Sequence, residues 1–278
     1  MFKRIDNVVI LTDMDGTFLP SDKIPSKRNL SALENFKNAG GRFSIATGRA
    51  LQAANQYFDV VKVNFPAILC NGGLIYDIQE AKELGSVYLP ENVRDITRKI
   101  LEDNADIGCE VVLLSDLYVP QMNKAEAEHN AICKIVPTLC TSIDEVPDNW
   151  YKVLFADEQE RMDELERYVS DQSFSGVDFV RSAKQYFEIL PLDVSKGYGV
   201  EFLRDTYCKK DDIIVCMGDY NNDIEMLKAA DIAVCPSNAV DEVKKICDIV
   251  LKSSCDEDAF AELIDIIFKE SQHKILEV

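Results

Sequence analysis

The clearest signal for the fold lies in ten consecutive residues near the N-terminus, Val8-Val9-Ile10-Leu11-Thr12-Asp13-Met14-Asp15-Gly16-Thr17. Residues 8–12 form a short apolar run of the kind that is buried on both faces of a parallel sheet. Two carboxylates and a glycine follow at the point where such a strand would end. In open α/β sheets, ligands bind at the carboxyl ends of the strands. The stretch therefore predicts both a parallel sheet and the position of its site.

Strands and helices alternate around this stretch, which indicates an α/β protein. We expect helices at 26–39, 50–58, 195–205, 222–230, 239–246 and 257–268, and strands at 42–46, 66–70, 212–217, 232–235 and near 249. Asn71-Gly72-Gly73 is a strong turn signal that leads into a hairpin. Residues 1–84 and 191–278 are thus predicted to form a doubly wound, Rossmann-like core with a parallel sheet.

The middle of the chain, residues 85–190, differs in pattern and is predicted to be an inserted α+β domain. A helix at 93–103 and strands at 110–114 and 118–119 are followed by a less regular stretch that contains Pro120 and Pro137. A strand at 151–155, a helix at 158–170 and strands at 178–181 and 186–189 complete it. The order helix–strand–strand thus occurs twice.

The composition and charge of the chain argue against several classes of binding partner and metal site. The 278 residues include 49 acidic and 30 basic side chains, so the net charge is −19, which argues against nucleic-acid or anionic-membrane partners. The first apolar segment is too short for a signal peptide or a membrane span. Nine cysteines without a CxxC pair indicate free thiols and a cytoplasmic protein. The two histidines lie far apart in sequence, so we expect no His-rich zinc site and no His-centred triad.

Asp13 and Asp15 are the sharpest candidates for chemistry. Two carboxylates on a tight turn can have different catalytic roles, because one can attack or bind metal while the other acts as acid and base. The alternative is an ordinary turn that is held by aspartate hydrogen bonds.

Other strand ends and helix starts carry polar groups of a similar kind. Thr47 and Gly48 could cradle a phosphate at a helix N-terminus, or Thr47 could simply cap that helix. Asp219, Asn222 and Asp223 could bind a hard cation such as Mg²⁺, or cap the next helix.

Lys196, at the start of a predicted helix, could hold a phosphate or be an ordinary solvated lysine. If these segments were only unrelated turns and helix caps, they would not all be expected to carry polar groups that suit the same ligands. The shared presence of such groups favours a site for Mg²⁺ and phosphate. If Lys196 and Arg49 both face the four aspartates, the site has a net charge near −2 without metal.

The segments DMDGTFL, ATGR, the lysine of SKG, and GDYNND occur in the order that is typical of the haloacid-dehalogenase (HAD) superfamily. The chain resembles the Cof-type phosphatases of that superfamily, which carry a type IIB cap domain. The resemblance implies a Mg²⁺-dependent phosphatase that hydrolyses small phosphorylated metabolites, sugar phosphates by default, through an aspartyl phosphate. Tyr220 is bulkier than we expect within the fourth motif.

The resemblance also implies roles for individual residues. Asp13 would be the nucleophile and Asp15 the general acid and then base. Phosphate or substrate would be bound by Met14, Thr47, Gly48, Lys196 and Asn222. Mg²⁺ would be held by Asp13, the carbonyl group of Asp15, Asp219 and Asp223.

Two other functions stay open from the sequence. A phosphomutase of the phosphomannomutase type would share this core and cap. A non-catalytic sensor could bind a phosphorylated ligand without turnover, although Asp15 argues against it. The expected partner is a small phosphomonoester, and the sequence implies no nucleic acid, membrane or obligate protein partner.

Overall fold

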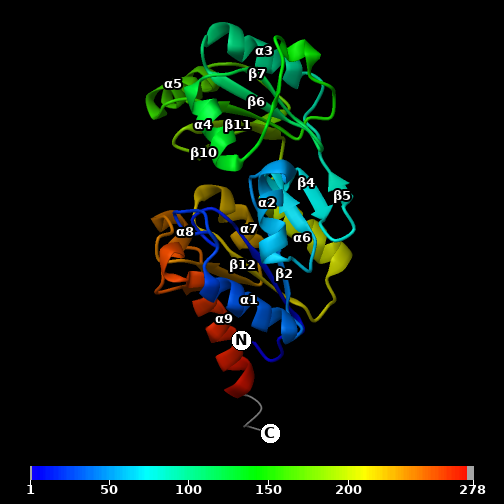
Figure 1. Cartoon of the computed structure of the whole chain (residues 1–278), viewed down its shortest axis with the longest axis vertical. Coiled ribbons are helices and arrows are strands. Elements are labelled where there is room, and N and C mark those ends of the chain that lie inside the picture. Colours follow the sequence, from blue (N-terminus) through cyan, green and yellow to red (C-terminus); the bar gives the residue numbers. More distant parts are fainter. Residues whose placement is uncertain (1, 274–278) are drawn as a thin grey trace. The chain divides into compact units, whose positions relative to one another are not determined.

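The computed structural model describes residues 2–273, which fold into two compact units (Figure 1). The first unit contains residues 2–47, 57–84 and 195–273, and the second contains 48–56 and 85–194. Among these residues, no helix is long and apolar enough to cross a membrane.

The first unit is built on a parallel five-stranded sheet with the order β14-β13-β12-β1-β2. Its strands are β1 (Val8–Thr12), β2 (Arg42–Ile45), β12 (Ile213–Met217), β13 (Ile232–Cys235) and β14 (Ile249–Val250). A separate antiparallel sheet contains β3 (Ala67–Leu69), β4 (Leu74–Asp77) and β5 (Lys82–Ser86), as the turn signal at Asn71 predicted. The helices are α1 (Lys27–Asn38), α6 (Lys196–Tyr207), α7 (Ile224–Ala229), α8 (Asp241–Lys244) and α9 (Ala259–His273). Helix α2 (Leu51–Val61) begins in the second unit and ends in the first.

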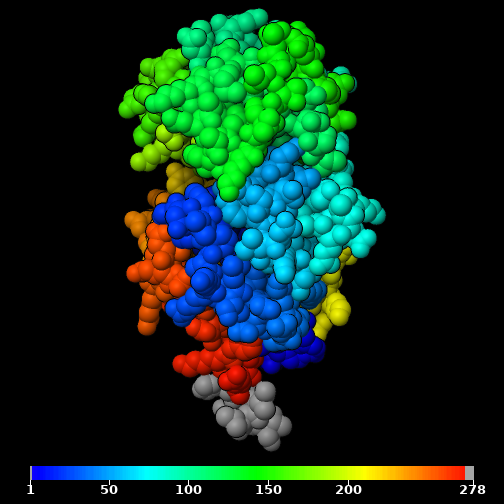
Figure 2. Space-filling model, viewed as in Figure 1, coloured from blue at the N-terminus to red at the C-terminus, as the bar shows by residue number. Residues whose placement is uncertain are grey.

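Apolar side chains cover both faces of the parallel sheet, so the prediction of a doubly wound α/β core is confirmed. On one face, Phe43 of β2 packs against Phe18 and against Phe260 of α9, with ring centroids 5.7 and 5.3 Å apart. Helices α1 and α9 lie side by side (Figures 1 and 2). On the other face, Val9 of β1 belongs to a buried cluster with Val200 of α6. Burial of both faces explains why residues 8–11 are apolar throughout.

The order of the strands defines where a ligand can bind. From β1 the chain proceeds to β2 on one side, whereas β12 pairs with β1 on the other side, in register from Val8 with Ile213 to Thr12 with Met217. This is a topological switch point, and the crevice at such a point lies outside the carboxyl ends of the two strands. Asp13 and Gly218, the residues that follow β1 and β12, therefore start at the same edge of the sheet.

The second unit contains a six-stranded sheet with the order β10-β11-β9-β6-β7-β8. Its strands are β6 (Gly108–Val112), β7 (Leu117–Gln121), β8 (Thr138–Leu139), β9 (Lys152–Ala156), β10 (Val177–Ala183) and β11 (Tyr186–Pro191). Its helices are α3 (Val93–Asp103), α4 (Lys124–Cys133) and α5 (Gln159–Ser170). Buried residues of α3 and α5, such as Ile100 and Leu165, share one apolar core with Val111, Val153 and Phe155 of the sheet.

Helix α4 lies in the stretch that the sequence analysis described as less regular. Its buried residues are Glu126, Asn130 and Cys133, so its inward face is largely polar. An apolar stripe with a 3.6-residue period is the main sequence signal of a helix, and α4 lacks it. The prediction for this segment was wrong for that reason.

Residues 48–56 belong to the second unit, whereas the sequence analysis grouped them with the first. Two glutamine side chains of α2 hold this segment. Gln52 Nε2 donates to the carbonyl group of Leu113 at 3.2 Å, and Gln56 Nε2 donates to that of Cys133 at 2.9 Å. Such contacts between distant segments cannot be predicted from the local sequence pattern.

Candidate active site

The turn after β1 places Asp13 at the carboxyl end of the strand. The Asp13 amide donates to the Met217 carbonyl group at 2.8 Å, which extends the pairing of β1 with β12 by one residue. Gly16 has a φ of +86°, and a Cβ atom there would lie 2.6 Å from Asp219 Oδ2. Only glycine fits such a position. The turn therefore closes directly against Asp219, two residues beyond the end of β12.

Lys196 lies between two of the predicted carboxylates. Ser195 caps α6, because its side chain accepts a hydrogen bond from the Tyr198 amide. Lys196 is fully buried, and its Nζ donates to Asp13 Oδ1 and to Asp223 Oδ1, both at 2.6 Å. Burial alone would lower the pKa of Lys196, but the two carboxylates outweigh burial and raise it above its ordinary value. The reading of Lys196 as a solvated lysine is thus excluded.

Asp223 organises the loop that follows β12. Its Oδ2 accepts hydrogen bonds from the amides of Asp219 at 2.9 Å and Tyr220 at 3.1 Å. Its other oxygen faces Lys196, and the residue is fully buried. The bulky Tyr220 thus contributes its backbone to this loop, and Asp223 fixes both the loop and the lysine.

Asp13, Asp219 and Asp223 form a compact acidic cluster, in which one oxygen from each lies within 4.8 Å of the others. Burial raises the pKa of Asp13 well above its ordinary value, Lys196 opposes this, and the neighbouring aspartates add to it. Burial also raises the pKa of Asp219 to about 6, although a hydrogen bond from Thr17 opposes the shift. One ammonium group does not balance three carboxylates, of which those of Asp13 and Asp223 are buried. The oxygen donors and the surplus negative charge fit a hard divalent cation.

Asp15 occupies a more open position than Asp13. Its side chain is 36% exposed and forms an ion pair with Lys23 at 2.8 Å. An exposed carboxylate can exchange protons with water and with a bound ligand. The four aspartates, Lys196 and Lys23 give a net charge of −2. The second positive charge in this sum is that of Lys23, which pairs with Asp15.

Thr47 and Asn222 are connected through Asn71. The Thr47 carbonyl group accepts a hydrogen bond from the Asn71 amide at 3.1 Å, and Asn222 Nδ2 donates to Asn71 Oδ1 at 3.3 Å. Thr47 and Asn71 are buried, and the Thr47 amide donates to Ile68 of β3 at 2.8 Å. The ends of three segments that are distant in sequence thus meet beside the acidic cluster.

Sequence reasoning missed several side chains at this site. Asn71 was read only as part of a turn, and Lys23 and Asn238 carried no signal. Asn238 Nδ2 donates to the Gly16 carbonyl group at 2.8 Å, and Thr17 Oγ1 donates to Asp219 Oδ1 at 2.5 Å. Only Thr17 lay within a quoted motif and could have been selected from the sequence.

Two predicted binding residues are placed differently from the rest. The Met14 side chain is fully buried, so a contribution of Met14 to substrate binding would come from its backbone. Gly48 belongs to the second unit together with Arg49. The structure brings Asp13, Lys196, Asp219 and Asp223 into one cluster, and phosphate binding by Gly48 stays a prediction.

Comparison with known proteins supplies the family. The family model for haloacid dehalogenase-like hydrolases matches residues 10–264. The chain belongs to the haloacid dehalogenase-like hydrolases. The resemblance inferred from the four motifs is thereby confirmed.

Several relatives of this HAD-like hydrolase are phosphatases. The 5-amino-6-(5-phospho-D-ribitylamino)uracil phosphatases YitU and YwtE of Bacillus subtilis are 24% and 27% identical to it. The matches cover 94% and 92% of this chain and 97% and 96% of those proteins.

Solved structures share the fold over nearly the whole chain. A haloacid dehalogenase-like hydrolase from Bacteroides thetaiotaomicron has a TM-score of 0.84 at 21% identity, with 94% of this chain and 99% of that chain covered. The HAD subclass IIB sugar phosphatase BT4131 has a TM-score of 0.79 at 19% identity, with 94% and 98% covered.

Proposed function

We propose that this HAD-like hydrolase is a Mg²⁺-dependent phosphatase that cleaves small phosphorylated metabolites, with sugar phosphates as the main class. One observation carries the proposal. The Asp13 carboxylate stands at the carboxyl end of β1, is held by the buried Lys196, and lies beside Asp219 and Asp223. A carboxylate that is oriented by a cation at a strand end is suited to attack on phosphorus.

Asp13 acts as the nucleophile in this proposal. Lys196 holds Asp13 Oδ1 at 2.6 Å and so fixes the orientation of the carboxylate. An oxygen of Asp13 bonds to phosphorus while the bond from phosphorus to the ester oxygen breaks. Asp15 gives its proton to the leaving alcohol.

Hydrolysis of the aspartyl phosphate follows. Asp15, now ionised, takes a proton from water, and the water oxygen bonds to phosphorus while the bond to Asp13 breaks. Inorganic phosphate leaves and Asp15 is again protonated. The exposure of Asp15 supports this role, because water reaches its carboxylate.

Asp13, Asp219, Asp223 and the Asp15 carbonyl group are the proposed ligands of Mg²⁺. When bound, the ion supplies positive charge that screens the carboxylates and the phosphoryl oxygens. The surplus negative charge of the cluster supports this assignment. Thr47, Asn222 and the ammonium group of Lys196 are the proposed contacts for the remaining phosphoryl oxygens.

The second unit is proposed to be the cap domain that sets substrate specificity. The names of the relatives suggest two substrate classes for testing, a ribitylamino-uracil phosphate and sugar phosphates. We also propose a cytoplasmic location, which is supported by nine cysteines, none of which forms a disulfide.

A phosphate-release screen tests this function. Purified protein is assayed against hexose and pentose phosphates, a ribitylamino-uracil phosphate, flavin mononucleotide and pyridoxal phosphate, with Mg²⁺ and with chelator. We expect release of phosphate from at least one of these compounds only with Mg²⁺. Turnover that requires a bisphosphorylated sugar activator would indicate a phosphomutase instead. Thermal stabilisation by a phosphorylated compound without any turnover would indicate a sensor.

A further inference from the structure

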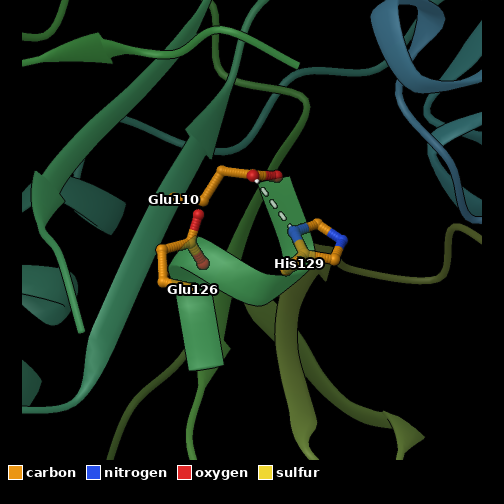
Figure 3. A group of neighbouring side chains, drawn as sticks. All are labelled: Glu110, Glu126 and His129. Carbon is orange, nitrogen blue, oxygen red and sulfur yellow. Dashed lines mark ion pairs between the residues drawn. The ribbon is translucent and has the colours of Figure 1, made fainter. Parts of the chain in front are cut away.

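Glu110, Glu126 and His129 form a second cluster of side chains that can bind metal, within the second unit (Figure 3). Glu110 lies on β6, and the other two lie three residues apart on α4, so they share one face of that helix. One ligand atom of each residue lies within 4.8 Å of the others. His129 Nδ1 is 3.4 Å from Glu110 Oε2. None of these residues has a part in the proposed phosphatase site.

Hydrogen bonds and close packing hold the polar face of α4 against the sheet. Asn123 caps the helix by accepting a hydrogen bond from the Glu126 amide at 2.8 Å, and its Nδ2 donates to the Ala156 carbonyl group of β9 at 2.8 Å. A Cβ atom at Gly108 would lie 2.7 Å from Glu126 Cβ, so glycine is needed for this close approach. The cluster is therefore held by rigid elements on both sides.

Within the described residues, His129 is the one basic side chain that pairs with a carboxylate of this cluster, at Glu110. Glu110 and Glu126 are 1% and 0% exposed, and within residues 2–273 neither pairs with a lysine or an arginine. Asn130 Nδ2 donates to Glu126 Oε1 at 2.7 Å, but Glu126 Oε2, Glu110 Oε2 and Asn130 Oδ1 have no hydrogen-bond partner. A carboxylate that is buried without a partner is costly, because it loses its hydration and gains no compensating charge. A positive charge between the two glutamates would therefore stabilise the unpaired oxygens, Glu110 Oε2 and Glu126 Oε2.

We propose that Glu110, Glu126 and His129 bind a divalent transition-metal ion of the zinc type, in addition to the Mg²⁺ of the active site. The charge of one such ion balances the two glutamates when the imidazole is neutral. Imidazole nitrogen suits zinc-like ions and is not a ligand that Mg²⁺ favours.

The surroundings of His129 support ligation through Nδ1. The other nitrogen, Nε2, lies 3.5 Å from Cys133 Sγ, and the ring packs edge-on against Tyr186 with centroids 4.8 Å apart. Outer contacts of this kind fix the orientation of a metal-binding histidine. The His129 side chain is 14% exposed, so the cluster lies close to the surface of the second unit. A bound ion would join α4 to β6 and so stabilise the second unit.

Metal titration of the full-length protein tests this site. Protein freed of metal by a chelator is titrated with Co²⁺ in excess Mg²⁺, which keeps the active-site aspartates occupied. Glu126→Gln is compared with Glu128→Gln, a matched control two residues further along α4, because Glu128 is exposed. Wild type and Glu128→Gln should bind one Co²⁺ per chain, absorb visible light and melt at a higher temperature with the ion. Glu126→Gln should bind it at least about 100-fold more weakly, since loss of even an outer contact can cost that much.

Two results would overturn the site. One is wild-type protein that takes up no Co²⁺ or Zn²⁺ in excess Mg²⁺, since the glutamates would then be neutralised by protons. The other is equal uptake by Glu126→Gln and Glu128→Gln. His129→Asn provides a second test if Glu126→Gln does not fold. Asp219→Asn should leave this Co²⁺ uptake unchanged, so failure of the proposed phosphatase activity and failure of this site can be told apart.

Discussion

Replacement of Lys196 by methionine removes the only positive charge that bonds two buried carboxylates of the described active site. Methionine keeps a similar side-chain length, so the change mainly deletes the ammonium group. Lys196 is fully buried and lies 2.6 Å from both Asp13 and Asp223. Loss of one partner of a buried ion pair costs about 3–5 kcal/mol. This corresponds to a fall in melting temperature of roughly 6–20 °C for a domain of this size.

The assay is thermal unfolding of Lys196→Met in chelator, with Lys23→Met as the matched control. Lys23 pairs with Asp15, but these side chains are 38% and 36% exposed, so the loss should stay below about 1 kcal/mol. Asp223→Asn should stabilise the Lys196→Met protein, because it removes one uncompensated charge, and should destabilise the wild type. Equal melting temperatures for Lys196→Met and Lys23→Met would refute the account of Lys196 as a buried counter-ion.

Three further predictions concern the metal and the turn. Gly16→Ala should weaken Mg²⁺ binding, measured by calorimetry, because its Cβ atom would lie 2.6 Å from Asp219 Oδ2; unchanged affinity would contradict the tight turn. In chelator, stability should fall as pH rises from about 4 to about 6, since folding raises the pKa of Asp219 from 3.8 to about 6 and the folded state then holds the extra proton. Asp219→Asn should flatten that slope in melting experiments across this pH range, and an equally steep slope would count against the shift. Removal of Mg²⁺ should weaken binding of a phosphorylated substrate, because a site charge of −2 repels a phosphate dianion; equal substrate affinity with and without metal would exclude this electrostatic role.

The core of the fold could be predicted because its signals are local. Residues 8–11 are apolar on both faces, and Asp13 follows two residues later, so the strand and its site are visible in ten consecutive residues. Ser195 marked the start of α6 for the same reason. The pairing of β1 with β12 then brings together motifs that lie more than half the chain apart.

Other features depended on contacts that no local pattern records. The burial of Lys196 follows from two carboxylates on other segments, and Asn71 gains its place only when β3 meets the loop after β12. Helix α4 was missed because its inward face carries Glu126 and Asn130 where a helix usually buries apolar side chains. The same polar face leads to the proposed metal site, which contains a single histidine. A search for several histidines or for CxxC pairs could not find it.

The identity of the phosphorylated residue tests the central claim most directly. Wild-type protein is quenched with acid during turnover of a substrate from the phosphate-release screen, and its peptides are mapped by mass spectrometry. The account predicts a phosphoryl group on Asp13, none on Asp15, and loss of nearly all turnover in Asp13→Asn. A phosphoryl group on a different residue, or an Asp13→Asn protein that turns over at the wild-type rate, would contradict it.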